Sequence, residues 1–204
     1  MYKTYYDSRD KQTSYVLKCR PEDIEIVILG NTLHGAKRNG INGTFYDTPR
    51  PSLPQSCWGL AVNEGKPIGV NAYTTSGKGI KRGVIAWDGK KMVCQRINHY
   101  KEIPNMKWGI SGAMLMPKYS RTVEKYLSDV YRKTNHTVIG YDKAMNIYVF
   151  VRTNSTMERL VQSCKFFGLE GAISLDGGGS SQLRFNDKGF ASSRKINSAV
   201  LVKG

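Results

Sequence analysis

The residues with the clearest chemical potential lie near the C-terminus, in the segment 171–182. An apolar run at 171–175 predicts a buried strand, and Asp176 follows it directly. Three glycines come next, and each loses more backbone entropy on ordering than any other residue would. Their use at a strand end indicates a loop that a ligand approaches closely, with N–H groups that suit an anion. The segment therefore predicts an anion site with a carboxylate at its mouth.

This glycine loop differs from the two common phosphate-binding loops. It lacks the Gly-Lys-Ser/Thr ending of a P-loop. It also has Gln182 where a dinucleotide fingerprint needs its last glycine, and Leu183–Phe185 has the character of a strand where that motif needs a helix. A glycine-rich hairpin loop without a ligand is the alternative interpretation.

The charge balance favours anionic partners. The 204 residues include 31 Lys plus Arg against 16 Asp plus Glu, a formal net charge of +15. Such a field attracts nucleic acid, anionic polymers and phosphorylated small molecules alike. The basic residues are scattered and form no basic tail, so charge alone does not separate a nucleic-acid-binding protein from an enzyme with a phosphorylated substrate.

Length and composition predict one domain spanning residues 1–204. The four cysteines form no Cys-x-x-Cys pair and so predict no zinc site. Residues 1–20 show no apolar core of a signal peptide, and no apolar run approaches the 18 residues or so of a membrane span. These features predict a cytoplasmic protein with no membrane contact and reduced thiols.

Most of the chain has the pattern of strands. Two pairs of strands flank the turn-forming residues 88–90 and 141–143, which predicts two hairpins. The predicted strands cover residues 16–19, 24–29, 83–87, 91–97, 137–140, 146–151, 171–175 and 183–185.

Two segments have helical periodicity. In 120–132, the apolar residues Val123, Tyr126, Leu127 and Val130 repeat with the spacing of one helix face. A second helix starts at the capping-box sequence 155–158 and ends before Gly168. The predicted fold class is therefore α+β, with a mixed or antiparallel sheet core and at least two packed helices in a single domain.

Five segments together resemble the phosphodiester glycosidase family. The most specific is Leu175–Ser181, similar to the family's Asp-Gly-Gly-Gly-Ser-Ser motif. Residues 42–47 resemble its Asn-Gly-Gly-Phe-Phe-Asp segment, and 111–116, 136–140 and 194–202 resemble three further segments in the right order. The resemblance is strongest over 40–204.

The sequence departs from the family pattern at three places. His136 stands where the family usually has Arg, and Thr44 replaces a glycine. The stretch 118–135 has no counterpart in the family pattern. The first two departures bear on substrate contacts, and the third bears on the shape of the pocket.

The resemblance implies a hydrolase that cleaves the bond between sugar C1 and a phosphate oxygen in an anionic small molecule. The charge and the missing signal peptide extend this expectation to nucleotide-derived substrates. Glycoside hydrolysis typically uses two carboxylates, for which Asp176 is the first candidate and Asp47 the second. A structural Asp in a turn is the alternative for Asp47.

The residues expected to bind the substrate or its phosphate share the matching segments. They are Asn42, Thr44, Ser111, Gly112, His136, Gly177, Gly178, Gly179, Ser180, Ser181 and Arg194. His136 and Arg194 would add positive charge or a hydrogen bond. No cofactor and no metal site are expected. A divalent cation is the alternative that stays open, because Asp176 and Asp47 are oxygen donors of the kind that it prefers, although two carboxylates do not by themselves make a site.

Two other functions remain open at this stage. One is a protein of the same fold that sequesters a phosphorylated or cyclic-nucleotide-type ligand without turnover. The other, less favoured, is a nucleic-acid-binding protein, whose affinity would fall steeply with salt. The sequence does not give the oligomeric state.

Overall fold

The structure is a computed structural model that describes residues 1–8, 11–47 and 55–203. Its larger sheet has ten strands, in the order β1-β2-β11-β10-β12-β9-β5-β6, and β7 pairs with both β8 and β9. The strands are β1 (Tyr2–Asp7), β2 (Gln12–Cys19), β5 (Ala61–Asn63), β6 (Lys66–Pro67), β7 (Arg82–Trp87), β8 (Met92–Ile97), β9 (Trp108–Met116), β10 (Thr134–Asp142), β11 (Ile147–Ser155) and β12 (Leu169–Ser174).

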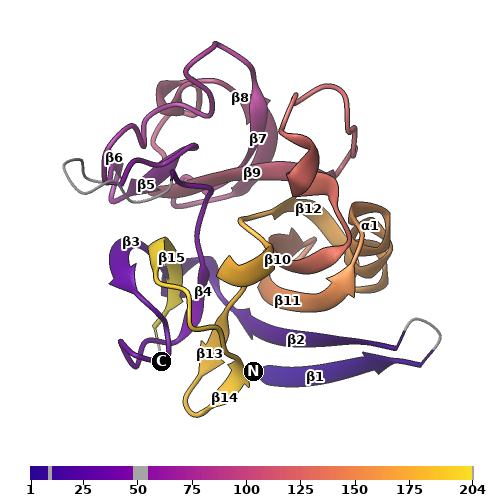
Figure 1. Cartoon of the computed structure of the whole chain (residues 1–204). Coiled ribbons are helices and arrows are strands. Elements are labelled where there is room, and N and C mark those ends of the chain that lie inside the picture. The colour runs from indigo at the N-terminus through magenta and orange to yellow at the C-terminus, as the bar shows by residue number, and fades with distance from the viewer. Residues whose placement is uncertain (9–10, 48–54, 204) are drawn as a thin grey trace.

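A second sheet of five strands has the order β14-β13-β4-β15-β3 (Figure 1). It joins β3 (Ile24–Asn31), β4 (Gly40–Asn42), β13 (Leu183–Phe185), β14 (Lys188–Phe190) and β15 (Ile196–Val202). All pairings between the named strands of both sheets are antiparallel. The strands predicted from sequence all lie within or overlap these strands, and both predicted hairpins form.

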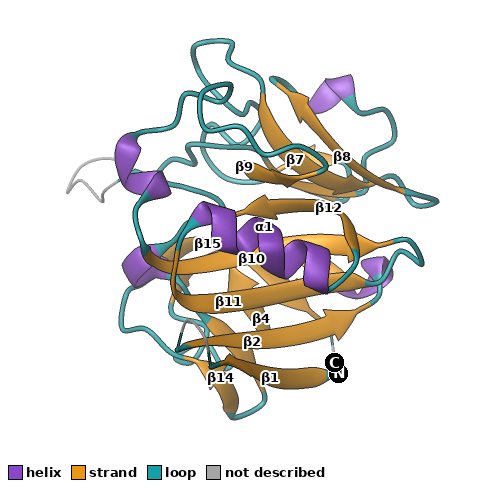
Figure 2. Cartoon of the chain, turned by 90° about the vertical axis from the view of Figure 1, so that its right-hand side faces the viewer, coloured by secondary structure: helices purple, strands orange, loops and turns teal. Residues whose placement is uncertain are grey.

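Alternation along the central strands divides the core into two layers. In β11, Val149 and Val151 point into a cluster shared with the second sheet, whereas Phe150 points into a cluster with the helix α1 (Met157–Phe166). This follows from the two-residue period of a strand. The helix therefore covers one face of the large sheet, over β9, β11 and β12, and the second sheet covers the other (Figure 2).

The helix α1 forms where the sequence predicted it, beginning one residue later than the capping box suggested. Thr156 is the N-cap, and its Oγ1 accepts a hydrogen bond from the Arg159 N–H at 3.5 Å. Leu160 and Cys164 are fully buried, as the periodicity required. Gly168, at φ +67°, ends the helix in a conformation that glycine adopts without strain.

The predicted fold class is wrong in its helices. The described residues hold one α-helix and two antiparallel sheets, so the chain is mostly β rather than α+β with at least two packed helices. None of the helices in the described ranges is long and apolar enough to cross a membrane.

The segment 120–132 forms turns and a short 3₁₀ helix, Ser128–Tyr131, in place of the predicted α-helix. Lys125 has φ +47°, which an α-helix cannot accommodate. Val123 and Leu127 on the predicted apolar face are 52% and 64% exposed, whereas the charged Glu124 is only 1% exposed. Only Tyr126 and Val130 of the predicted apolar face pack against the core, and the most deeply buried side chain of the segment is the carboxylate of Glu124.

Candidate functional site

A pocket of about 660 Å³ opens at the ends of β12 and β4, and segments distant in sequence form its wall. β10 pairs with β12 in the register Val138↔Ser174, which brings residues 134–136 beside the glycine loop that follows β12. The pocket is lined by Phe45, Tyr46, Asp47, Gln55, Trp58, Arg82, Tyr126, Leu127, Asp129, Val130, Arg132, Thr134, His136, Leu175, Asp176, Gly177, Gly178, Arg194 and Lys195.

Asp176 is the central carboxyl of this pocket. Burial raises its pKa, and the negative Asp129 acts in the same direction. A hydrogen bond from the Ser180 hydroxyl, the Gly177 N–H at 2.9 Å from Oδ1 and the positive Arg194 oppose the shift. Asp176 therefore retains a proton at higher pH than a solvent-exposed Asp, as a group that exchanges protons with a substrate must.

Two guanidinium groups explain the glycines. Gly178 has φ +60°, and a Cβ there would lie 2.9 Å from Arg132 Nη2. A Cβ on Gly179 would lie 3.1 Å from Arg194 Cζ. A side chain at either position would force the neighbouring guanidinium to shift, so the glycines let Arg132 and Arg194 pack closely against the loop.

Both guanidinium groups are available to a ligand. Arg132 and Arg194 are exposed, and neither side chain makes a hydrogen bond or an ion pair with another described residue. Arg194 was predicted from its family segment. Arg132 was missed because it lies in the stretch without a family counterpart, where its only signal was the basic pair Arg132-Lys133.

Asp47 lines the pocket, but its carboxylate also has a clear structural partner. Its Oδ1 accepts from the Ser56 N–H at 2.7 Å, and its Oδ2 accepts from the Ser56 hydroxyl at 2.8 Å. This is the geometry of the alternative interpretation, an Asp that closes a turn. Asp129 is a third carboxylate that lines the pocket, and it was not predicted from the sequence. It belongs to the stretch 118–135, and its side chain has no hydrogen-bond partner among the described residues.

Four predicted binding residues lie beneath the pocket and support it. Asn42 is buried, its Oδ1 accepts from Thr137 Oγ1 at 2.7 Å and its Nδ2 donates to the Asp176 carbonyl at 2.8 Å. Asn42 thus fixes the main chain that carries Asp176. The other three are Thr44, Ser111 and Gly112. Thr44 Oγ1 lies 3.4 Å from Ser111 Oγ, which also accepts a hydrogen bond from the Leu60 N–H. Gly112 packs so closely against β12 that a Cβ there would lie 2.3 Å from the Ser174 carbonyl oxygen.

The two serines of the motif also point inward. Ser181 Oγ donates to the Asn135 carbonyl at 3.1 Å, which ties the loop to β10. Ser180 Oγ lies 3.4 Å from the hydroxyl of Tyr46, a pocket residue of the segment 42–47. Ser180 and Ser181 therefore brace the loop from below, while Gly177 and Gly178 form its surface in the pocket and Gly179 is exposed beside Arg194.

His136 lines the pocket and is buried. Burial lowers the pKa of its imidazole and the nearby Arg132 charge acts in the same direction, whereas hydrogen bonds with the backbone of Arg132 and Ser155 oppose the shift. Its Nε2 lies 3.1 Å from the Arg132 carbonyl oxygen, so this nitrogen carries the proton and donates it. The ring thereby holds the main chain of Arg132 in place rather than adding a positive charge.

Phe45, Trp58 and Tyr126 form an aromatic wall of the same pocket. The Phe45 and Tyr126 rings are 5.1 Å apart, and the Arg82 guanidinium carbon lies 4.0 Å from the Tyr126 ring centre. Trp58 donates its backbone N–H to the Phe45 carbonyl at 2.7 Å and is 51% exposed. A large aromatic side chain left half open in a pocket is suited to contact a ligand.

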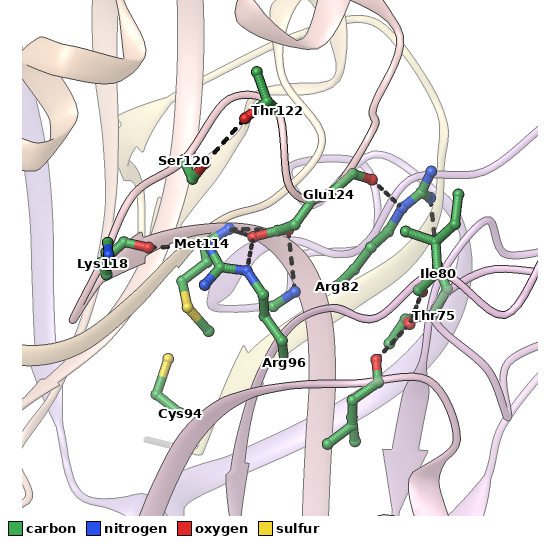
Figure 3. A network of polar contacts seen from close by, with 12 residues as sticks. Thr75, Ile80, Arg82, Cys94, Arg96, Met114, Lys118, Ser120, Thr122 and Glu124 are labelled. Atoms are coloured by element: carbon green, nitrogen blue, oxygen red, sulfur yellow. Dashed lines mark hydrogen bonds and ion pairs between the residues drawn. The ribbon is translucent and has the colours of Figure 1, made fainter.

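The segment that carries Tyr126, Asp129 and Arg132 is anchored by Glu124 (Figure 3). The Glu124 carboxylate accepts from the Gly83 N–H at 3.1 Å, the Met114 N–H at 3.2 Å and Arg96 Nε at 2.9 Å. Burial raises the pKa of Glu124, and these donors oppose the shift. A carboxylate with donors from β7, β8 and β9 fixes this pocket wall to three strands at once.

The described residues contain no group of three or more His, Cys, Asp and Glu side chains placed to hold a metal ion.

Comparison with known proteins gives a consistent result. A family model described as phosphodiester glycosidase matches residues 38–203. No curated protein sequence gives a significant match.

Several solved structures share the fold. The catalytic domain of zebrafish N-acetylglucosamine-1-phosphodiester alpha-N-acetylglucosaminidase, auto-inhibited by its pro-peptide, superposes with a TM-score of 0.73 at 14% identity, covering 100% of this chain and 82% of that one. A hypothetical protein from Synechocystis gives 0.69 at 12% identity, covering 99% and 61%. A putative exported protein from Burkholderia pseudomallei K96243 gives 0.68 at 10% identity, covering 95% and 74%.

Proposed function

Since the chain belongs to the phosphodiester glycosidase family, we propose that it hydrolyses a glycosyl–phosphate bond, between sugar C1 and a phosphate oxygen, in an anionic substrate. One observation carries the proposal. A buried carboxyl, Asp176, sits beside two guanidinium groups that have no acidic partner among the described residues, in a pocket of about 660 Å³. Such a pocket has the size of a small-molecule site.

The chemistry assigns roles to these groups. Water adds to C1 as the C1–O bond breaks, so that the sugar gains a hydroxyl and the phosphate departs with the bonding electrons. Arg194, which lies beside Gly179, stabilises the negative charge that develops on the departing phosphate. Asp176, whose raised pKa keeps it protonated to higher pH, donates a proton to the phosphate oxygen.

A second carboxylate, which activates the water, comes from one of two residues. Asp47 matches the family segment, but both of its oxygens accept hydrogen bonds from Ser56. Asp129 has no such restraint and is close enough to Asp176 to raise its pKa. Both residues line the pocket, and substitution of each one in turn distinguishes between them.

The test is to incubate the purified protein with a mixed panel of sugar-1-phosphodiesters and follow the products by mass spectrometry. Asp176→Asn should lower kcat on the order of 10³-fold, the scale of a lost general acid. The matched control is Asp187→Asn, which changes a fully exposed Asp in the turn between β13 and β14 and should retain activity.

Two results would overturn the proposal. Undiminished turnover in Asp176→Asn would remove this residue from the chemistry. A compound that binds and is recovered intact after denaturation would identify a sequestering protein that uses the same pocket without the reaction.

A further inference from the structure

The pocket combines an aromatic wall with two guanidinium groups that have no acidic partner among the described residues, and this combination specifies more than a sugar phosphate. We infer that the substrate is a nucleoside diphosphate whose terminal phosphate is joined to C1 of a sugar. This inference rests on the proposed hydrolase and names the substrate class of the same site. In the reaction, water adds to C1, the C1–O bond breaks, and the products are a free sugar and a nucleoside diphosphate.

The count of charges supports two phosphates. A simple sugar phosphodiester carries one negative charge, which a single guanidinium would match. Arg132 and Arg194 pack against successive glycines, Gly178 and Gly179, and neither has an acidic partner among the described residues. Two phosphates linked by one bridging oxygen place two adjacent charges opposite these two neighbouring cations, each able to bind bidentately.

The order of the phosphates follows from the position of the aromatic wall. Arg132 belongs to the segment that carries Tyr126 of this wall, whereas Arg194 comes from a different part of the chain, beside Gly179, so Arg194 binds the phosphate next to the bond that breaks. Arg132 then binds the phosphate farther from the sugar. His136 keeps Arg132 in this position through the hydrogen bond from Nε2 to the Arg132 carbonyl.

The aromatic wall supplies a place for the base. Tyr126 lies six positions before Arg132 in the same anchored segment, so the base site adjoins the site of the distal phosphate. The Arg82 guanidinium covers the Tyr126 ring, which leaves the half-exposed Trp58 as the side chain free to stack on a planar ring. Stacking of a base on an aromatic side chain contributes about tenfold in affinity and tolerates different bases.

The experiment compares two matched sets of substrates that share the same sugars, namely glucose, mannose and N-acetylglucosamine. One set carries a uridine or adenosine diphosphate at C1, and the other carries a methyl phosphodiester. We expect kcat/KM to be at least about 100-fold higher for the nucleoside diphosphate sugars, because they engage both the second guanidinium and the aromatic wall.

Two variants with matched controls locate the contacts. Arg132→Gln should raise KM for nucleoside diphosphate sugars about 30-fold, the cost of one charged hydrogen-bond pair, and leave methyl phosphodiesters within about threefold. Its control is Arg121→Gln, an exposed Arg of the same segment outside the pocket. Trp58→Ala should raise the same KM about tenfold, with Tyr73→Ala, another exposed aromatic outside the pocket, as control.

The outcomes separate this inference from the hydrolase on which it rests. Equal or faster cleavage of methyl phosphodiesters, with Arg132→Gln affecting both sets alike, would overturn the substrate class while the hydrolase stands. If no compound is cleaved, the hydrolase fails, and titration calorimetry with the same compounds decides the ligand class. Binding of nucleoside diphosphate sugars that requires Arg132 would support that class, and equal or no binding of the two sets would overturn it.

Discussion

At the scale of single residues, ionisation of the Asp176 carboxyl lowers the stability of the folded protein. Burial raises the pKa of this carboxyl from its ordinary value of 3.8, so the folded state disfavours the charged form. Below the unfolded pKa both states are protonated and Asp176 costs nothing. As pH rises through the folded pKa, the unfolded state ionises more readily, and the protein loses stability.

Asp176→Asn should therefore stabilise the protein while it removes activity. We expect a gain on the order of 1 kcal/mol at pH 7, typical of a removed active-site charge. The gain should shrink toward zero as pH falls below about 4, where the wild-type carboxyl is protonated in both states. Thermal melts of both proteins between pH 3 and 8 measure it. A lower Tm for the variant at pH 7 would show that Asp176 holds the fold together instead.

Measurements of stability and of kcat also distinguish the two candidates for the second carboxylate. Asp47→Asn replaces one of the two oxygens that accept hydrogen bonds from Ser56 with an NH2 group, so we expect a loss of about 1 kcal/mol in stability. Asp129→Asn breaks no hydrogen bond of its side chain with a described residue and should leave Tm unchanged. We expect only one of the two to lower kcat as far as Asp176→Asn does, measured at saturating substrate. Equal loss in both, or in neither, would contradict a two-carboxylate mechanism.

At the scale of elements, the closeness of β9 and β12 depends on one glycine. A Cβ on Gly112 would lie 2.3 Å from the Ser174 carbonyl oxygen, a backbone atom that cannot move without separating the strands. Gly112→Ala should cost about 3 kcal/mol or more in the free energy of unfolding. Gly77→Ala is the control, because nothing lies within 4 Å of its added Cβ. Urea denaturation compares them, and equal midpoints would show that the strands adjust.

The position of the segment 118–135 depends on Glu124. Glu124→Gln leaves the carboxylate's donors with one acceptor oxygen and Arg96 without its counter-ion, so we expect a loss of roughly 2–3 kcal/mol. Because the segment carries Tyr126 and Arg132, KM should rise as well. Glu170→Gln, an exposed change on β12, is the control for both measurements. A variant as stable as this control would exclude Glu124 as the anchor.

Local sequence patterns predicted some of the elements and not others. The strands and α1 were predictable because alternation and capping are local signals, and each agrees with what the core buries. The segment 120–132 carried an equally good helical period, yet its structure is set by donors on β7, β8 and β9 that no local pattern records. Asp176, Arg194 and the glycine loop were predicted for the site, and they line the pocket or lie beside it. Arg132, Asp129 and Tyr126 were missed because they belong to that same segment.

At the scale of the whole molecule, the net charge of +15 should guide an anionic substrate to the pocket. We expect kcat/KM to fall severalfold between about 20 and 300 mM salt, since the Debye length shortens, while kcat stays constant. Initial rates at low and saturating substrate separate the two. A salt-independent kcat/KM would show that the net charge serves another purpose. Duplex DNA that binds tightly at about 150 mM salt and displaces the substrate would favour the nucleic-acid alternative.

The hydrogen bond from Asn42 to the Asp176 carbonyl joins residues 134 positions apart in the chain. Closing so long a loop costs conformational entropy, and the bond forms only while β4 and the end of β12 lie side by side. No contiguous fragment of the chain holds the site, and any opening that separates β4 from β12 dismantles it. Ligand affinity therefore reports on the integrity of the entire chain, and a tight ligand would slow proteolysis at loops far from the pocket.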